Sequence, residues 1–284
     1  MKNQTLRNAQ TGGLVRLFQH CSELERNYFA EKNDVVLTIA WNDGADQHVT
    51  IDGIKHELPS NTIVTLLANQ SFEFEHPDWV IAWQFNREFY CIIDHDQEVS
   101  CAGLLFYGVE EAPLINLDEK EQRKVNLLYQ VFLDEFADRD SLQADMMQML
   151  LKRLIITVTR LYKKQNELQS IPAEELDSVR QYNLLVEKHF RKWHQVQDYA
   201  NEMFKSPKTL SNLFKKSNSP SPLRVIHERI ALEAKRLLIY TDHTVKEIAY
   251  ELGFEEVPPF NRMFKKIVKE TPSQFRKGMS NRPS

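Results

Sequence analysis

The chain repeats one eight-residue pattern, first as Thr209-Leu-Ser-Asn-Leu-Phe-Lys-Lys216 and again as Pro259-Phe-Asn-Arg-Met-Phe-Lys-Lys266. In each copy the second and sixth residues are apolar, as Leu210 and Phe214 are in the first copy, and two lysines close the pattern. Residues four positions apart lie on the same face of a helix. Each copy therefore predicts a helix with one packed face and a basic end.

A second short amphipathic segment precedes each copy, at residues 196–204 and 245–253. These segments carry a small residue at matching positions, Ala200 and Ala249, which allows two helices to cross closely. Gly253 can take the left-handed backbone conformation that ends a helix. The pattern in both copies is thus helix, tight turn, helix, which places its second helix in the major groove of DNA.

The segment between the two units, residues 222–240, has apolar residues at helical spacing and no internal glycine or proline. It predicts one rigid linking helix, with Ile226, Ile230, Leu237 and Leu238 on its packed side. If both recognition helices lie on one face, they reach successive major grooves about 34 Å apart and cover roughly 20 base pairs.

Residues 178–284 resemble the DNA-binding domain of the AraC/XylS family of bacterial transcription regulators. Three elements of the second unit carry the resemblance in order and spacing: Gly253-Phe254, Phe260-Asn-Arg-Met-Phe-Lys-Lys266 and Thr271-Pro-Ser-Gln-Phe-Arg276. The first unit departs from the family pattern at two positions. Phe204 stands where the family commonly has glycine, and Asn212 where arginine is frequent.

The resemblance implies which side chains face the DNA bases: Lys208, Thr209, Ser211 and Asn212 in the first unit, and Val257, Pro258, Asn261 and Arg262 in the second. Arg262 is the best single candidate, because a guanidinium binds guanine O6 and N7 with two hydrogen bonds. Proline suits the first turn of a helix, where its missing N–H would have no partner.

Phosphate contacts are expected from the lysine pairs Lys215, Lys216, Lys265 and Lys266, and from the helix starts at Ser221 and Thr271, where backbone N–H groups face an anion. Taken alone, such lysine pairs are more often solvated helix ends.

The charge distribution agrees with a DNA-binding C-terminal part. From Ser178 onward the chain has 20 Lys and Arg against 11 Asp and Glu, a net charge of +9. The preceding residues have 16 against 29, a net charge of −13, so the whole-chain value of −4 hides a division of charge. A basic domain attracts phosphates, and its binding weakens as salt rises.

The length of 284 residues and the composition indicate an α+β protein of two domains. We expect a regulatory or dimerisation domain with two C-terminal helices at 1–165, a polar linker at 166–177, and the DNA-binding domain at 178–284. Within the last, the helix-turn-helix units are placed at about 196–217 and 244–268.

The first domain begins as β structure. Residues 48–58 place Asp52-Gly53 between two β-type runs, which is a strong hairpin signal. Further strands are expected at 72–75 and at 79–85, where Trp79, Ile81, Trp83 and Phe85 alternate onto one face. Several short strands indicate a small barrel or jelly roll, and this part resembles the cupin-like sensor domain found in many members of the family.

Two helices follow, at 118–137 and 141–164. The second carries an apolar stripe of Leu150, Leu154, Val158 and Leu161, which has to pack against something. It either pairs two subunits, as these helices often do in the family, or covers the β domain.

Barrel mouths bind small molecules, so the aromatic residues Phe72, Trp79, Trp83 and Tyr90 are candidates for an effector pocket, with plain core as the alternative.

The sequence predicts neither a metal nor a cofactor. His48 and His56 are scattered across the hairpin, whereas a metal site needs three or four convergent donors. Cys21, Cys91 and Cys101 form no CxxC pattern, which fits buried thiols better than disulfides or a zinc site.

The chain is expected to be cytoplasmic, on the nucleoid. No basic-plus-apolar signal segment stands at its N-terminus, and Lys152, Arg153 and Arg160 interrupt the most apolar helix, 146–162.

The leading hypothesis is a sequence-specific transcription regulator, not an enzyme, whose partners are promoter DNA, a small-molecule effector or a second subunit, and RNA polymerase if it activates. One alternative is a cupin-type enzyme with a DNA-binding appendage, which needs a metal or a nucleophile and base in a pocket. The other is a constitutive DNA binder without an effector.

Overall fold

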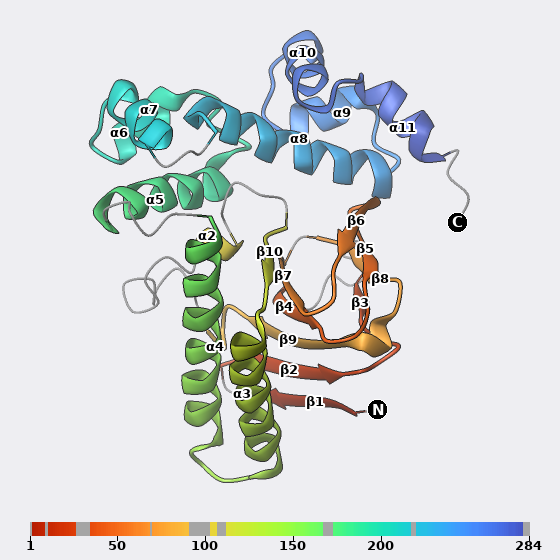
Figure 1. The fold of residues 1–284 in the computed structure, drawn as a ribbon. Coiled ribbons are helices and arrows are strands. Elements are labelled where there is room, and N and C mark those ends of the chain that lie inside the picture. Colours follow the sequence, from red (N-terminus) through yellow and green to blue (C-terminus); the bar gives the residue numbers. More distant parts are fainter. Residues whose placement is uncertain are drawn as a thin grey trace. The chain divides into compact units, whose positions relative to one another are not determined.

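The computed structural model describes residues 2–8, 11–26, 35–68, 70–90, 103–106, 112–166, 173–216 and 220–280. It divides the chain into two compact units, Met1–Gln169 and Ser170–Ser284. The first unit contains the strands and two long helices, and the described part of the second is helical (Figure 1). The expected α+β organisation in two parts is confirmed.

The first unit contains two antiparallel sheets. One has the order β1-β2-β9-β4-β7-β10, with bounds Lys2–Arg7, Leu14–Gln19, Val80–Asn86, Val36–Asn42, Thr62–Leu66 and Leu114–Asn116. The other has the order β3-β8-β5-β6, with bounds Glu25–Arg26, Phe72–Phe74, Gln47–Ile51 and Ile54–Leu58. Side chains from both sheets form one apolar cluster, including Phe18, Val49, Val64, Phe72 and Ala82. Burial of this shared face holds the sheets together.

The β5–β6 hairpin forms where the sequence predicted it. Ile51 pairs with Ile54, and the two residues between them have positive φ angles, 47° at Asp52 and 76° at Gly53. Two consecutive left-handed residues match the right-handed twist of the flanking strands, which explains the preference for an Asp-Gly pair here.

The strand expected at 79–85 differs from its prediction. Trp79 belongs to a short 3-10 helix, η1 (Pro77–Trp79), and β9 begins at Val80. All residues of β9 from Val80 to Phe85 are buried: Ile81, Trp83 and Phe85 share one face, as expected, and Val80, Ala82 and Gln84 share the other. One face packs on α3, where Trp83 contacts Tyr129 and Phe132, and the other faces the second sheet, since Val80 and Ala82 belong to the shared apolar cluster.

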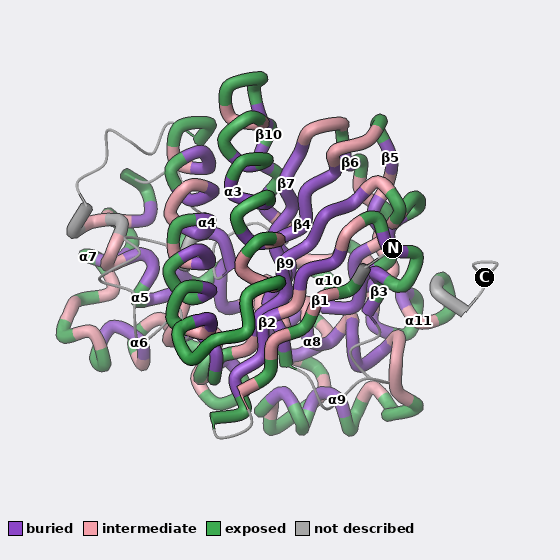
Figure 2. Tube along the Cα trace, turned by 90° about the horizontal axis from the view of Figure 1, so that it is seen from below, coloured by how far each residue is buried: buried purple, intermediate pink, exposed green. Residues whose placement is uncertain are grey.

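Helices α3 (Glu119–Ala137) and α4 (Gln143–Gln165) pack against each other as a hairpin, and a four-residue helix, α2 (Gly103–Phe106), precedes β10. Asp118 and Glu121 cap the start of α3 reciprocally. The stripe formed by Leu150, Leu154, Val158 and Leu161 is buried within the single chain. Of the two roles left open for this stripe, covering the chain's own core is the one that its burial supports. Figure 2 shows exposed positions along both helices, and the apolar residues Leu127, Val131, Met146 and Met149 are among the exposed ones.

The second unit contains the helices α5 to α11, with bounds Ala173–His189, Val196–Glu202, Pro207–Lys216, Pro222–Tyr240, Val245–Glu251, Val257–Val268 and Pro272–Ser280. The long helix α8 is central: α5, α7, α9, α10 and α11 all pack against it, and its apolar side is buried. Helix α5 begins inside the polar stretch that was expected to be linker, of which residues 167–172 lie outside the described part.

Candidate nucleic-acid interface

The two helix-turn-helix units have the same turn. In the first, the backbone N–H of Lys205 donates to the carbonyl of Ala200 at 2.9 Å. In the second, the N–H of Phe254 donates to the carbonyl of Ala249 at 3.0 Å. Such bonds close a helix end only if the residue before the donor is left-handed. Phe204 has a φ angle of 52° and Gly253 one of 83°, so these two residues are structural equivalents.

The surroundings of the two turns explain why one tolerates phenylalanine. The side chain of Phe204 is 98% exposed, so its size meets no neighbour. At Gly253 a Cβ atom would overlap the carbonyl oxygen of Arg191. Glycine is therefore needed in the second turn for its conformation and for its close packing.

Each recognition helix buries one face and exposes the other. Leu210 and Phe214 are buried in α7, and Phe260, Met263 and Phe264 in α10. Ring contacts extend the second cluster, since Phe260 lies 5.9 Å from Phe264 and 5.5 Å from Phe254 between ring centroids. The polar faces remain available for a ligand on the outside.

The residues expected to face bases lie on these outer faces. The exposed ones are Lys208, Thr209, Ser211, Asn212, Pro258 and Arg262, and the half-buried ones are Val257 and Asn261. Local bonds already engage two of the hydroxyls: that of Thr209 lies 2.8 Å from the hydroxyl of Ser206, and that of Ser211 donates to the carbonyl of Pro207 at 2.8 Å. The Oδ1 atom of Asn261 is buried without a hydrogen-bond partner, so this residue points partly inward.

The residues expected to contact phosphate are in less uniform settings. Lys215, Lys265 and Lys266 are exposed, whereas the Nζ atom of Lys216 pairs with Glu175 of α5 at 2.8 Å. Thr271 caps α11: its N–H and hydroxyl both donate to the Oε1 atom of Gln274, at 3.0 and 2.8 Å.

A basic cleft of about 300 Å³ lies between the start of α8 and the end of α10. It is lined by Ser221, Leu223, Arg224, His227, Glu228, Lys266, Ile267 and Lys269. Two residues expected to contact phosphate, Ser221 and Lys266, thus share one site. Burial, and then the charge of Lys266, lower the pKa of His227 below its ordinary value, so the imidazole favours its neutral form.

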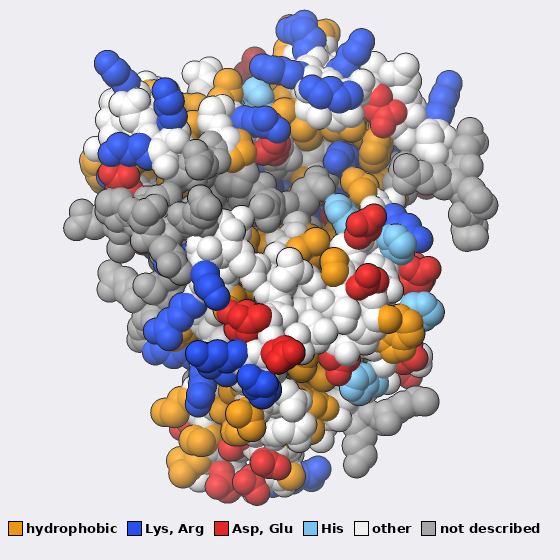
Figure 3. Space-filling model, in the orientation of Figure 1, with side chains coloured by type: hydrophobic (Ala, Val, Ile, Leu, Met, Phe, Trp, Pro, Cys, Tyr) orange, Lys and Arg blue, Asp and Glu red, His pale blue; other side chains and the backbone are white. Residues whose placement is uncertain are grey.

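Sequence reasoning missed Arg224, His227 and Lys269, because no spacing along the chain shows that the ends of two different helices meet. The only signal was the positive charge of the region. Figure 3 shows that charge as Lys and Arg side chains gathered around α10 and beside α7.

The four candidates for an effector pocket do not converge. Phe72 is in the cluster between the sheets, while the ring of Trp83 packs on Tyr129 of α3 at a centroid distance of 6.3 Å. Trp79 stacks on His76 at 4.2 Å, and Tyr90 is buried. Phe72, Trp79 and Trp83 thus have different packing partners.

His48 and His56 lie on β5 and on the edge strand β6. The Nδ1 atom of His48 is 2.8 Å from the Oε2 atom of Glu75, and this bond lowers the pKa of the carboxyl group. Among the described residues, no group of three His, Cys, Asp or Glu side chains is placed to hold a metal. Cys21 is a buried thiol, and Cys91 and Cys101 lie outside the described residues.

In the described part of the chain, no helix combines the length and the apolar character needed to cross a membrane.

A protein-family model described as a helix-turn-helix domain matches residues 199–278, which run from α6 into α11. The C-terminal unit is an AraC-type helix-turn-helix domain. The AraC-type domain is 31% identical over 100 residues to the HTH-type transcriptional regulator ExsA of Pseudomonas aeruginosa, a match that covers 35% of this chain and 36% of ExsA. It is 30% identical over 96 residues to the HTH-type transcriptional activator RhaS of Salmonella schwarzengrund, covering 33% of this chain and 34% of RhaS.

The chain thus spans about a third of the length of the curated relatives it matches. Among solved structures, ToxT of Vibrio cholerae is similar over 98% of this chain and 100% of its own, with 17% identity and a TM-score of 0.42.

Proposed function

We propose that this protein is a sequence-specific transcription regulator that places α7 and α10 in successive major grooves of promoter DNA. One observation carries the proposal: two helix-turn-helix units with the same turn bonds each present a polar helix face inside one AraC-type domain.

Within this interface the side chains divide into base readers and phosphate binders. Arg262 is exposed in the first half of α10, the part of a recognition helix that reaches base edges. Lys215, Lys265 and Lys266 lie at the helix ends, where cations face the DNA backbone. The basic cleft adds Arg224 and Lys269 to the phosphate binders.

For the N-terminal compact unit, Met1–Gln169, we propose a regulatory role, as a sensor of a small molecule or as a dimerisation surface. Exposed apolar residues on the α3–α4 hairpin support pairing: Leu127 and Val131 on α3, with Met146 and Met149 on α4. Figure 3 shows hydrophobic side chains gathered over the lower part of this hairpin. A second copy of the chain would cover them and bring a second AraC-type domain to the DNA.

The experiment is selection of genomic fragments by the purified full chain at about 150 mM salt, a near-physiological ionic strength. Wild type is compared with Arg262→Ala and Lys266→Ala. We expect Arg262→Ala to lose preference at one base position, at a cost of about 1–3 kcal/mol. Lys266→Ala should weaken all sites alike and lower the salt slope by about one.

Sequence-specific recognition would be contradicted if the wild type retained all fragments equally and lost this binding as the salt concentration rose. A uniform effect of Arg262→Ala on every site would remove the base-reading role of Arg262 and leave the proposal to the other exposed residues.

A further inference from the structure

The segment Arg191–His194, between α5 and α6, forms a joint between the two helix-turn-helix units. The carbonyl of Arg191 fills the space where Gly253 lacks a Cβ atom. The Nε2 atom of His194 lies 2.9 Å from the carbonyl of Leu252, and its ring lies 4.4 Å from that of Phe254. The segment that leads into the first helix-turn-helix thus rests on the turn of the second helix-turn-helix.

The joint is fixed to the first unit by Trp193. The hydroxyl of Tyr199, in α6, donates to the carbonyl of Trp193 at 2.8 Å, and the two rings meet edge to face at 5.3 Å. Tyr199 is buried and also packs on Tyr182 of α5, so α6 cannot shift without moving the joint.

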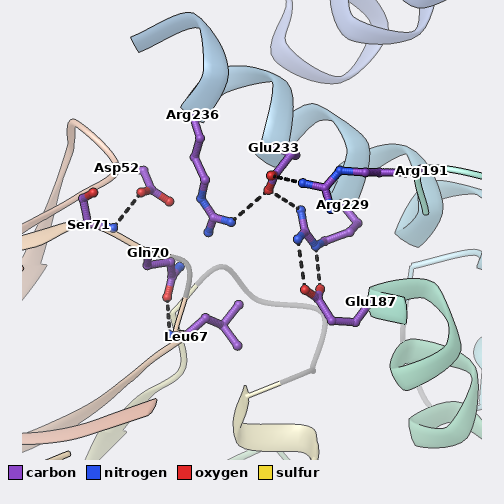
Figure 4. Close-up of polar contacts among 9 residues, drawn as sticks. All are labelled: Asp52, Leu67, Gln70, Ser71, Glu187, Arg191, Arg229, Glu233 and Arg236. Carbon is purple, nitrogen blue, oxygen red and sulfur yellow. Dashed lines mark hydrogen bonds and ion pairs between the residues drawn. The ribbon is translucent and has the colours of Figure 1, made fainter. Parts of the chain in front are cut away.

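The joint is also fixed to α8, by an ion network (Figure 4). The Nη2 atom of Arg191 is 2.6 Å from the Oε1 atom of Glu233, and Arg229 bonds both Glu233, at 3.1 Å, and Glu187 of α5, at 2.5 and 3.0 Å. Burial alone would raise the pKa of Glu233, but the pairing with Arg229 and Arg236 holds it below its ordinary value. The network therefore stays charged at neutral pH.

The joint lies close to the reading end of α10. Only three residues separate Gly253 from Val257, the first residue of that helix. Base-reading side chains lie at the N-terminal end of a recognition helix, so a shift of this turn moves the reading end of α10 relative to the first unit.

Helix α8 leads into α9 through residues 241–244, whose ends, Thr241 and Thr244, are extended rather than helical. A connection of this kind offers a hinge, and the joint bridges it.

We propose that this joint fixes the separation of α7 and α10, and so determines the spacing between the two DNA half-sites that the protein accepts. His194 is then a positioning residue: it acts on DNA recognition through the joint and does not contact the DNA. This inference rests on the proposed function, two recognition helices reading one DNA site.

Half-site spacing gives a readout that protein stability does not. One added base pair moves a half-site by about 3.4 Å along the duplex and rotates it by about 35°. A rigid pair of recognition helices cannot follow this displacement, whereas a loosened pair can.

The experiment measures the affinity of the full chain for a selected site, for the same site with one base pair inserted or removed between half-sites, and for a single half-site. Wild type should lose at least about tenfold in affinity on insertion, comparable to the loss of one base contact. His194→Ala should lose less than about threefold on insertion and bind the single half-site as wild type does. His194→Gln, whose side-chain amide can still donate to the carbonyl of Leu252, should keep most of the wild-type spacing dependence.

An unchanged spacing profile in His194→Ala would overturn the inference and assign the spacing to the packing on α8 alone. Weaker binding to the single half-site together with a lower melting temperature would overturn it too, because His194 would then only hold the domain folded. If wild type itself shows no preference among DNA sites, the proposed function fails, which the wild-type measurement reveals before any variant is compared.

Discussion

Replacing Phe204 by glycine should stabilise the C-terminal compact unit, Ser170–Ser284. Phe204 is left-handed, with a φ angle of 52°, a conformation that costs an L-residue about 1–2 kcal/mol. Its side chain is 98% exposed, so truncation loses almost no buried area. Glycine also raises the conformational entropy of the unfolded chain, which lowers stability by about 0.5–1 kcal/mol. The difference is a gain of about 0.5–1 kcal/mol in the free energy of unfolding.

The assay is urea unfolding of the full chain, followed by tryptophan fluorescence, with ΔG obtained by linear extrapolation. Trp193 reports on the second unit, since its ring packs on Tyr199. The matched control is Phe204→Ala, which removes the ring but keeps the Cβ atom and its conformational cost, and should be close to neutral. The equivalent position gives the opposite sign: Gly253→Ala should destabilise by more than about 3 kcal/mol, because strain adds to overlap with Arg191.

Equal stabilities of the glycine and alanine variants of Phe204 would refute the reasoning, because the left-handed conformation would then carry no cost. A loss of stability in both would show that the ring makes a contact that its exposure conceals. Neither variant is expected to change DNA affinity.

Two further predictions concern pH and association. Burial lowers the pKa of His194 below 6.5, its ordinary value, so the unfolded chain binds the proton more tightly, and stability should fall as pH decreases through about 6.5. In urea unfolding between pH 8 and 5, His194→Gln should flatten this dependence of stability on pH. A dependence as steep as that of wild type would exclude His194 as a contributor. Val131→Asp and Met149→Lys place charges on the exposed face of the α3–α4 hairpin and should convert a dimer to a monomer in sedimentation analysis, whereas a wild-type chain that is already monomeric would contradict the proposed pairing surface.

The local elements of this protein follow from short stretches of its sequence. Asp52 and Gly53 form the two-residue turn because left-handed angles suit them, and the spacing of Leu210 and Phe214 reproduces the buried side of α7. The repeated pattern was also enough to indicate two helix-turn-helix units, since each depends on contacts within about twenty residues of chain.

The roles of individual residues depended on neighbours that are distant in sequence. The alternation of Trp79, Ile81, Trp83 and Phe85 included a residue that belongs to η1, and it did not show that β9 is buried on both faces, by α3 on one and by the second sheet on the other. An apolar stripe such as that of α4 has the same spacing whether it covers the chain's own core or a partner.

The joint shows the same limit for the candidate interface. Gly253 and Phe204 occupy equivalent turns, and helix-end rules require only a left-handed residue in each. The turn at Gly253 accepts only glycine because the carbonyl of Arg191 approaches it closely. The packing of α5, α6 and α8 brings Arg191 to this turn. Hydrogen bonding and side-chain periodicity act over a few residues and can be deduced from the chain itself, whereas close packing depends on which distant segments meet, and that is established only when the domain folds.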